Sequence, residues 1–282
     1  RRQRQMCIRD RRYTGRTLVS PDGSVAFDWV GTYLETRFTG GKLSVKVSET
    51  GTSYYNVFVD GKLHKVVKVC GTDTLIHLVS GIDKRIHSLK IQKRSEGEFG
   101  KTTVHQFVLS GSGRLAEEPA VRTRHIEFIG NSLTCGYGTD GKHRDEPFLV
   151  ETENCNLTFA SMVARYYDAD YTLIAHSGRG AARNYGDSVR VSKVTMKDRM
   201  LNTFDEDLTH KWNFKEYRPD LVVINLGSND FSTEPHPYKS EFTKAYKQIL
   251  AQLREHYGDI PILCIYPVAC LLYTSDAADD KA

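Results

Sequence analysis

The hydrophobic pattern of this chain changes its period near residue 115, and this change limits the possible folds most strongly. Between residues 12 and 115, apolar and polar residues alternate in short runs rich in Val, Ile, Tyr, Phe and Thr, a pattern typical of half-buried strands. The predicted strands are 25–30, 33–38, 42–48, 54–60, 63–70, 74–79, 85–94 and 104–110. Asp60-Gly61 predicts a tight hairpin. Short strands without a convincing helix indicate a β-sandwich with a jelly-roll-like topology.

After residue 120, apolar strands alternate with helical spacing. The predicted strands are 125–130, 171–176, 220–227 and 259–269, the last two buried, and the predicted helices are 157–169 and 242–258. This alternation predicts a doubly wound parallel α/β sheet. We therefore expect two domains, a β-sandwich over 12–115 and an α/β domain over 120–269. Active sites of such sheets lie beyond the carboxyl ends of the strands.

Composition is that of an ordinary globular protein, with 39% hydrophobic and 26% charged residues. No run of about 18 apolar residues exists, so we expect no membrane insertion. The net charge is +4, but residues 1–11 alone carry five Arg. The near-neutral remainder argues against a nucleic-acid partner.

Both ends of the chain, residues 1–11 and 270–282, lack the patterns of the rest and resemble non-native additions, which we exclude from fold reasoning. The alternative is a natural basic arm and a natural acidic tail. A signal peptide is not visible in this sequence.

The six cysteines show no C-x2-C spacing, so the sequence contains no indication of zinc. Cys135 and Cys155 are candidates for a disulfide, and the sequence does not decide whether they pair. Buried free thiols are the default expectation for cysteines of this kind.

Three short segments follow the ends of three predicted parallel strands, and they contain Ser132, Gly178 and Asn229. Alone, each has an ordinary explanation: a helix cap, a turn or a strand end. Together they are the residue types that acyl transfer needs. A serine supplies the nucleophile, and a glycine N–H, an Asn amide and the serine N–H supply donors for the oxyanion.

These segments resemble the SGNH/GDSL hydrolase superfamily, and in detail carbohydrate esterase family 2, the two-domain acetyl xylan esterases. The matching stretches are IEFIGNSLTCGYG, ENCNLTFASMVAR, AHSGRGAARNYG and KWNFKEYRPDLVVINLGSNDF, with the β-rich first half, over residues 15–269. The resemblance implies that Ser132 is the nucleophile and that Ser132, Gly178 and Asn229 form the oxyanion hole. It further implies removal of acetyl groups from xylan or glucomannan without metal or cofactor.

The chain departs from the family at two places. Asn131 stands where the family usually has an aspartate before the nucleophile. No position matches the late D-x-x-H-type block that supplies the family's catalytic histidine, so we expect an incomplete SGNH-type sheet and little Ser132-dependent hydrolysis from these 282 residues. Among the ten histidines, His236 is the one substitute that we consider, against the ordinary alternative of a solvated loop residue.

Other residues have weaker assignments. Tyr185 is a candidate substrate-binding residue that stacks on a sugar ring, and Tyr137 and Trp212 are further candidates, although aromatics in α/β proteins more often pack in the core. Arg183 is expected to hold the second-block loop or to touch substrate. Arg165 and Arg199 are expected to be solvated helix residues.

Two other functions remain open from the sequence. One is an SGNH acyl hydrolase of the lipase or thioesterase kind, and the other is a non-catalytic carbohydrate-binding protein. For the preferred function, the partner is an acetylated polysaccharide or oligosaccharide, and the intact protein is expected to be secreted or periplasmic. The sequence leaves the oligomeric state and the role of the β-sandwich undetermined.

Overall fold

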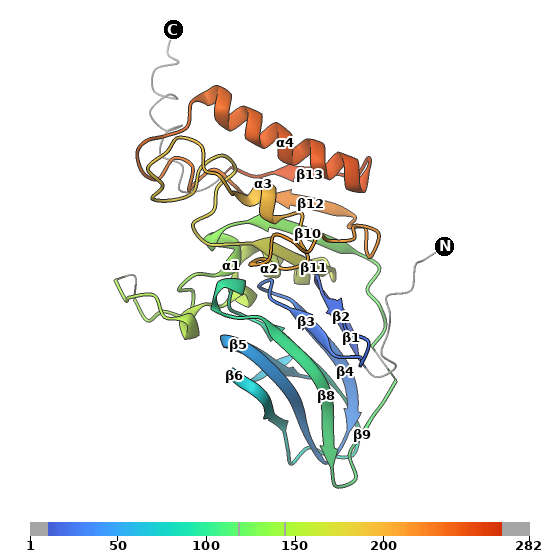
Figure 1. The fold of residues 1–282 in the computed structure, drawn as a ribbon. Coiled ribbons are helices and arrows are strands. Elements are labelled where there is room, and N and C mark those ends of the chain that lie inside the picture. The colour runs from blue at the N-terminus through green and yellow to red at the C-terminus, as the bar shows by residue number, and fades with distance from the viewer. Residues whose placement is uncertain (1–10, 118, 144, 267–282) are drawn as a thin grey trace.

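The computed structural model describes residues 11–117, 119–143 and 145–266. It has a β-rich half below and an α/β half above (Figure 1). Except for Arg11, the ends that the sequence predicts to be non-native lie outside the described residues. Arg11 is buried and donates to the carbonyl of His105 at 3.2 Å.

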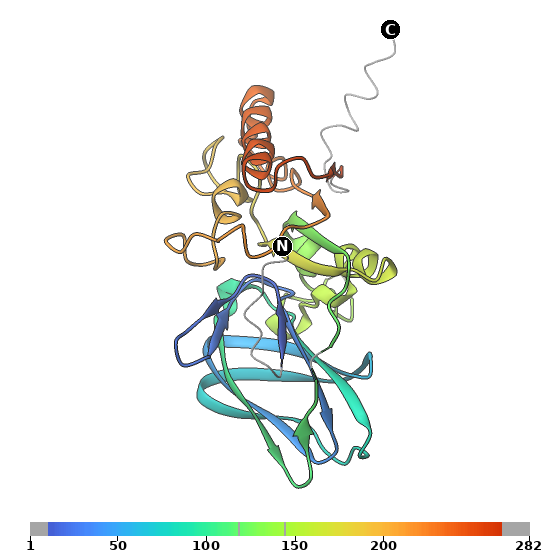
Figure 2. The ribbon, with the colours of Figure 1, turned by 90° about the vertical axis from the view of Figure 1, so that its right-hand side faces the viewer.

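The β-rich half is one antiparallel sheet that curls around its own core (Figure 2). Its order is β1-β4-β7-β5-β8-β3-β2, with β6 beside β5 and β9 beside β4. The elements are β1 (Arg12–Thr14), β2 (Leu18–Val19), β3 (Val25–Phe27), β4 (Tyr33–Thr39), β5 (Lys42–Val59), β6 (Lys62–Val79), β7 (Ile86–Lys93), η1 (Gly97–Phe99), β8 (Thr102–Ser110) and β9 (Arg114–Leu115). The predicted β-sandwich architecture is confirmed.

Two strands of this sheet are longer than the sequence predicts, and here the predicted strand boundaries were wrong. β5 and β6 each run unbroken for 18 residues, where the sequence predicts four separate strands. Register shifts in their pairing absorb the turn-like residues. The first part of β5 pairs with β8 and the last part with β7. The predicted hairpin is confirmed: Asp60 and Gly61 join β5 to β6 with φ of 50° and 76°.

The α/β half contains a parallel sheet in the order β11-β10-β12-β13. Its strands are β10 (His125–Gly130), β11 (Asp170–Ala175), β12 (Leu221–Ile224) and β13 (Ile262–Cys264). Its helices are α1 (Ser132–Cys135), η2 (Val150–Thr152), η3 (Cys155–Leu157), α2 (Phe159–Tyr166), α3 (Met196–Arg199) and α4 (Lys239–Tyr257). In the described part of the chain, no helix has the length and apolarity to cross a membrane.

Helices cover both faces of this sheet, as the continuous apolar runs predict. Ile129 and Ile224 pack with Leu253 of α4 on one face. Phe128 and Val223, which alternate with them along the strands, share the other face with Ala164 of α2. The parallel doubly wound architecture is therefore confirmed.

The two edges of the sheet differ. β13 is an edge strand among the described residues, and Leu263 is 50% exposed, so the prediction of a strand buried on both faces was wrong here. The opposite edge strand, β11, is buried throughout.

The β-rich half covers the edge at β11. The Tyr33 and Tyr171 rings lie 5.4 Å apart, and Gln92 donates to the Tyr171 hydroxyl at 2.6 Å. A Cβ at Gly31 would lie 2.6 Å from Leu173 Cδ1, so only glycine permits this close approach. The β-rich half therefore shields β11 from solvent, although β11 is an edge strand of its sheet.

Candidate active site

The carboxyl ends of three neighbouring strands lie next to one another in the parallel sheet. Gly130 of β10 pairs with Ala175 of β11, and Ile129 pairs with Ile224 of β12. The segments that follow these strands are therefore neighbours, as the sequence predicts.

Ser132 opens the first helical turn after β10. The side chain of the N-cap Asn131 accepts from Leu133 N–H at 3.3 Å, and the backbone carbonyl of Asn131 accepts from Thr134 N–H and Cys135 N–H at 2.8 and 2.9 Å. Asn131 is fully buried, whereas Ser132 is partly exposed. The turn therefore presents the serine while its preceding residue anchors the helix start.

Side-chain hydrogen bonds connect this turn to the other two segments. Asn131 donates to Ser228 Oγ at 2.9 Å, which joins the first segment to the third. Asn229 donates to the carbonyl of Arg179 at 2.8 Å, which joins the third segment to the second. An Asn amide has two N–H donors, so Asn229 keeps one for another acceptor.

Gly178 has the backbone that the site requires of a glycine. Its φ is +75°, and no heavy atom lies within 4 Å of the position that a Cβ would occupy. The residue is partly exposed, so its surroundings leave room for a bound molecule.

Asp230 organises the second segment, and sequence reasoning did not single it out. Its buried carboxylate accepts three backbone N–H groups, from Ala181 at 3.0 Å, Ala182 at 2.6 Å and Arg183 at 2.9 Å. Burial raises the pKa of Asp230, while these bonds oppose the shift. A Cβ at Gly180 would lie 2.4 Å from the same carboxylate. The adjacent Asn-Asp pair was the available signal.

Beneath the segments lies a group of buried ionisable residues that we call the junction cluster. Its members are Asp28, Lys93, Glu96, Glu153, His176 and Asp205. Glu96 belongs to the β-rich half, and its carboxylate accepts from Ser177 N–H at 2.6 Å and from the Ser177 hydroxyl. No sequence pattern indicates this role, because a Glu between two strands is ordinarily a solvated turn residue.

The pKa values of three members of the junction cluster are raised. Burial and the nearby Asp205 carboxylate raise the pKa of Asp28 to about 7. Burial and Glu96 raise the pKa of Glu153 to about 11. Burial lowers the pKa of His176, but the Asp205 carboxylate, 2.7 Å from Nδ1, outweighs it, so the net pKa is raised.

In the described part of the chain, no histidine hydrogen-bonds to Ser132. His236, the candidate substitute base, pairs with Glu234 at 3.2 Å, and its carbonyl accepts from Arg190 at 2.7 Å. His176 is buried against Asp205.

The aromatic candidates occupy different positions. Tyr185 is 61% exposed, and its N–H donates to the carbonyl of Gly178 at 2.8 Å, so it lies beside the second segment. Tyr137 is 48% exposed and stacks on Phe148 with ring centroids 3.7 Å apart. Its N–H donates to the carbonyl of Ser132 at 3.2 Å. Both rings can present a face to a sugar near the strand ends.

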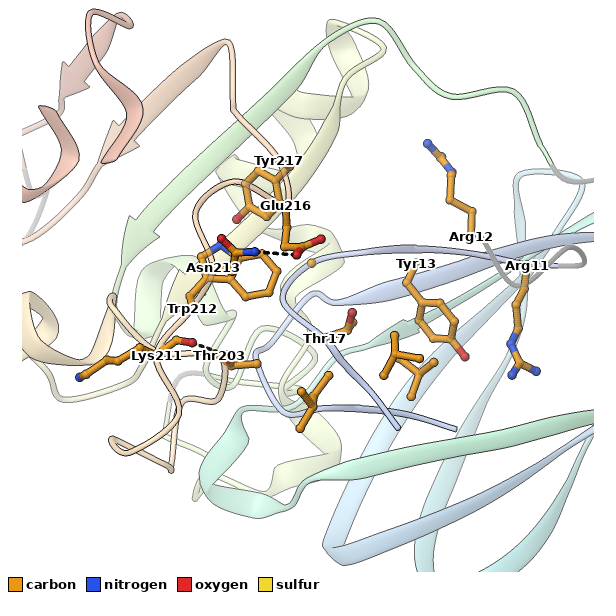
Figure 3. A pocket seen from close by; sticks show the side chains of 14 residues that line it. Arg11, Arg12, Tyr13, Thr17, Thr203, Lys211, Trp212, Asn213, Glu216 and Tyr217 are labelled. Carbon is orange, nitrogen blue, oxygen red and sulfur yellow. Dashed lines mark hydrogen bonds between the residues drawn. The ribbon is translucent and has the colours of Figure 1, made fainter. Parts of the chain in front are cut away.

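Trp212 lines a separate cavity of about 290 Å³ between the start of the β-rich half and residues 203–217 (Figure 3). Tyr217 lines the same cavity and stacks on His125, which begins β10, whereas Ser132 follows the end of that strand. Trp212 therefore lies near the amino-terminal ends of the strands, away from Ser132, and is not part of the candidate site.

The arginine predictions had mixed outcomes. Arg183 is buried and holds the second-block loop, since it donates to the carbonyl of Val189 at 3.0 Å and to Thr233 Oγ1 at 3.0 Å. Arg165 is exposed, as predicted. The prediction for Arg199 was wrong: it is buried and pairs with Asp205 at 2.9 Å.

Two groups of residues contain side chains of the kinds that bind metal ions, and in each group the possible ligand atoms lie within 4.8 Å of one another. They are Glu96, Cys135 and Glu153, and His176, Asp205 and Glu206. One oxygen of each acidic residue named here already has a protein donor: Glu153 Oε2 accepts from Glu96 N–H at 2.9 Å, and Asp205 Oδ1 accepts from Arg199 at 2.9 Å. We assign no metal to either group. Cys135 and Cys155, which the sequence left open, are both buried free thiols.

Comparisons with known proteins match both halves. Residues 13–119 match the family model "Carbohydrate esterase 2 N-terminal", and residues 128–282 match the GDSL-like lipase/acylhydrolase family. A solved family two carbohydrate esterase from Clostridium thermocellum, in complex with cellohexaose, is 33% identical, with a TM-score of 0.86 over 95% of this chain and 82% of that chain. The chain belongs to carbohydrate esterase family 2.

Curated relatives of this family 2 chain carry names of the same kind. It is 35% identical to the cellulase/esterase CelE of Acetivibrio thermocellus over 89% of this chain and 30% of that protein. It is 33% identical to an acetylxylan esterase/glucomannan deacetylase of Cellvibrio japonicus over 78% of this chain and 61% of that protein. The chain thus spans less than two thirds of either relative.

Proposed function

We propose that this family 2 chain is a serine esterase that removes O-acetyl groups from plant-wall polysaccharides. In this proposal Ser132 is the nucleophile, and the oxyanion donors are Ser132 N–H, Gly178 N–H and Asn229 Nδ2. The observation that carries the proposal is the meeting of three strand ends, joined by the Asn131–Ser228 and Asn229–Arg179 hydrogen bonds.

The proposed reaction has two steps. Ser132 Oγ attacks the acetyl carbon, its proton passes to a histidine base, and the sugar hydroxyl leaves with a proton to give an acetyl-enzyme. Water then attacks the acetyl-enzyme and releases acetate. For the base we keep the family's D-x-x-H histidine, which no position of the printed sequence matches.

The proposed substrate is an acetylated xylan or glucomannan. The Cellvibrio japonicus relative is named an acetylxylan esterase and glucomannan deacetylase, and the Clostridium thermocellum esterase was solved with cellohexaose. Tyr185, exposed beside Gly178, is the proposed platform for a sugar ring. A polymeric substrate of this kind requires an extracellular enzyme, so we propose secretion.

The test compares acetate release from acetylated xylan and glucomannan with hydrolysis of long-acyl nitrophenyl esters, using the product of the complete gene. We expect the complete gene product to prefer the acetylated polysaccharides. Ser132→Ala should abolish that activity, whereas Ser240→Ala, at an exposed serine of α4, should retain it. Undiminished activity in Ser132→Ala, or a preference for long acyl chains, would contradict the proposal.

One observation favours a second candidate, carbohydrate binding without turnover. Among the described residues, Ser132 lacks a histidine partner. If this candidate holds, the Ser132→Ala variant of the complete gene product will bind cello-oligosaccharides as tightly as the parent, and neither protein will release acetate.

A further inference from the structure

We propose that Glu96, from the β-rich half, is a positioning residue that orients the oxyanion-binding loop of the hydrolase half. This inference rests on the proposed function of Ser132 and Gly178. Glu96 is fully buried, and its two carboxylate oxygens accept the N–H and the hydroxyl of Ser177, which directly precedes Gly178.

The contact acts on the peptide group that carries the Gly178 N–H. That peptide joins Ser177 to Gly178 and is planar, so its direction depends on the backbone of Ser177. Glu96 holds Ser177 at two atoms, and the carbonyl of Gly178 accepts from Tyr185 N–H at 2.8 Å on the other side. Gly178 has no side chain that could pack against its neighbours, and no heavy atom lies within 4 Å of the position that a Cβ would occupy. The direction of its N–H therefore depends on hydrogen bonds to the backbone around it.

Glu96 is itself held from both halves of the molecule. Its N–H donates to Glu153 Oε2 at 2.9 Å, and its carbonyl accepts from Lys93 Nζ at 3.3 Å. The next residue, Gly97, packs so closely that a Cβ would lie 2.9 Å from Asp205 Cβ. A carboxylate fixed at its backbone and aimed at one loop is suited to orient that loop. The β-rich half would therefore form part of the active-site support.

The alternative is that Glu96 only holds the two halves together. Arg16 provides the matched control, because it is another buried charge from the β-rich half that bonds across the junction. It donates to the carbonyls of Met200 at 2.6 Å and Asn202 at 2.9 Å. Arg16 also lies over the Trp212 ring, which lines the cavity away from Ser132.

The experiment measures kcat and KM for 4-nitrophenyl acetate, cellohexaose binding and Tm in the complete gene product. Glu96→Ala should lower kcat about 10- to 100-fold, as expected when an oxyanion donor is misplaced. KM and the cellohexaose Kd should stay within about twofold, since these report ground-state binding. Glu96→Gln should recover part of kcat, because its amide oxygen still accepts one bond. Arg16→Lys should lower Tm without lowering kcat.

If Glu96→Ala does not fold, the Ser177→Ala variant still tests the inference, because this substitution removes only the hydroxyl contact to Glu96 and keeps the N–H contact. Its effect on kcat should be non-additive with that of Glu96→Gln. The inference is overturned if kcat in the folded Glu96 variants stays within about twofold of the parent, or if Arg16→Lys lowers kcat equally. Ser132→Ala separates the two proposals: if its hydrolysis equals that of the parent, the proposed function has failed, whatever the Glu96 variants do.

Discussion

Asn131 is the residue at which this chain departs from the family's aspartate, and its contacts explain why an amide is tolerated. Its oxygen caps α1 through Leu133 N–H, and its nitrogen donates to Ser228 Oγ. In Asn131→Asp the carboxylate can still cap the helix, and the Ser228 hydroxyl can turn to donate. Asn and Asp are about equal as N-caps, so we expect a change below about 1 kcal/mol in the free energy of unfolding.

Asn131→Ala is the contrasting variant. It loses the cap and leaves the Ser228 hydroxyl without its partner, so it should lower the free energy of unfolding by about 1–3 kcal/mol. Urea unfolding of both variants checks this prediction. Equal losses for Asp and Ala would show that the cap and the Ser228 contact do not carry the effect.

The positions of Ser132, Gly178 and Asn229 were predictable, because each lies in the segment that follows a strand and the carboxyl ends of parallel strands lie on the same side of a sheet. Glu96 was not predictable in this way, since its partner Ser177 lies 81 residues away along the chain. Likewise, the burial of Arg199 depends on Asp205, which no helical pattern reveals. Local pattern places residues on elements, whereas polar partners from distant segments require the assembled structure.

At the scale of elements, the loop after β11 depends on a carboxylate that follows β12. Asp230 accepts three N–H groups of that loop. Asp230→Asn keeps one acceptor oxygen, so at least one buried N–H loses its partner. We expect a loss of about 1–3 kcal/mol in the free energy of unfolding and a lower kcat. Urea unfolding and 4-nitrophenyl acetate kinetics measure the two effects.

Asp220→Asn is the control for this variant. Asp220 is exposed and accepts the N–H of His125 at 2.8 Å, at the amino-terminal ends of the strands of the same sheet. The Asp220→Asn variant should lose less stability than Asp230→Asn and should keep its kcat unchanged. A kcat loss as large in Asp220→Asn as in Asp230→Asn would contradict a local role for Asp230.

Element types were predictable where hydrophobic periodicity was long, as in β10, β12 and α4. The errors came where tertiary contacts overrode local signals. The pattern around Gly51 predicts a strand break, yet Gly51 lies within β5. The glycine is needed there for packing, since a Cβ would lie 2.1 Å from the carbonyl oxygen of Phe99. β13 has the apolar composition of a buried strand but lies at the edge of the described sheet.

For the whole molecule, the junction cluster predicts how stability depends on pH. The native pKa of Asp28 is about 7 against an ordinary value of 3.8. Native protein therefore keeps a proton that the unfolded chain releases, so stability falls as pH rises between these values. The raised pKa of His176 acts in the same direction: its contribution is complete below pH 6.5 and is lost as pH rises through the native pKa.

Urea unfolding between about pH 5 and pH 7 checks this prediction. One retained proton corresponds to about 1.4 kcal/mol per pH unit. Asp28→Asn should therefore make the fall in unfolding free energy across this interval less steep, while the proton that Glu153 retains, with its pKa of about 11, keeps part of the slope. An unchanged slope in the variant, or parent stability that rises with pH, would show that Asp28 does not hold the proton.

The central claim is that Ser132 is the acylated residue of a site built by three strand ends. Reaction of the complete gene product with diethyl 4-nitrophenyl phosphate, followed by peptide mass spectrometry, tests it most directly. We predict one phosphoryl group per chain, on the peptide that contains Ser132, with acetyl-ester hydrolysis lost in proportion to labelling. Labelling of another serine with loss of activity, or full activity in protein labelled at Ser132, would contradict the claim.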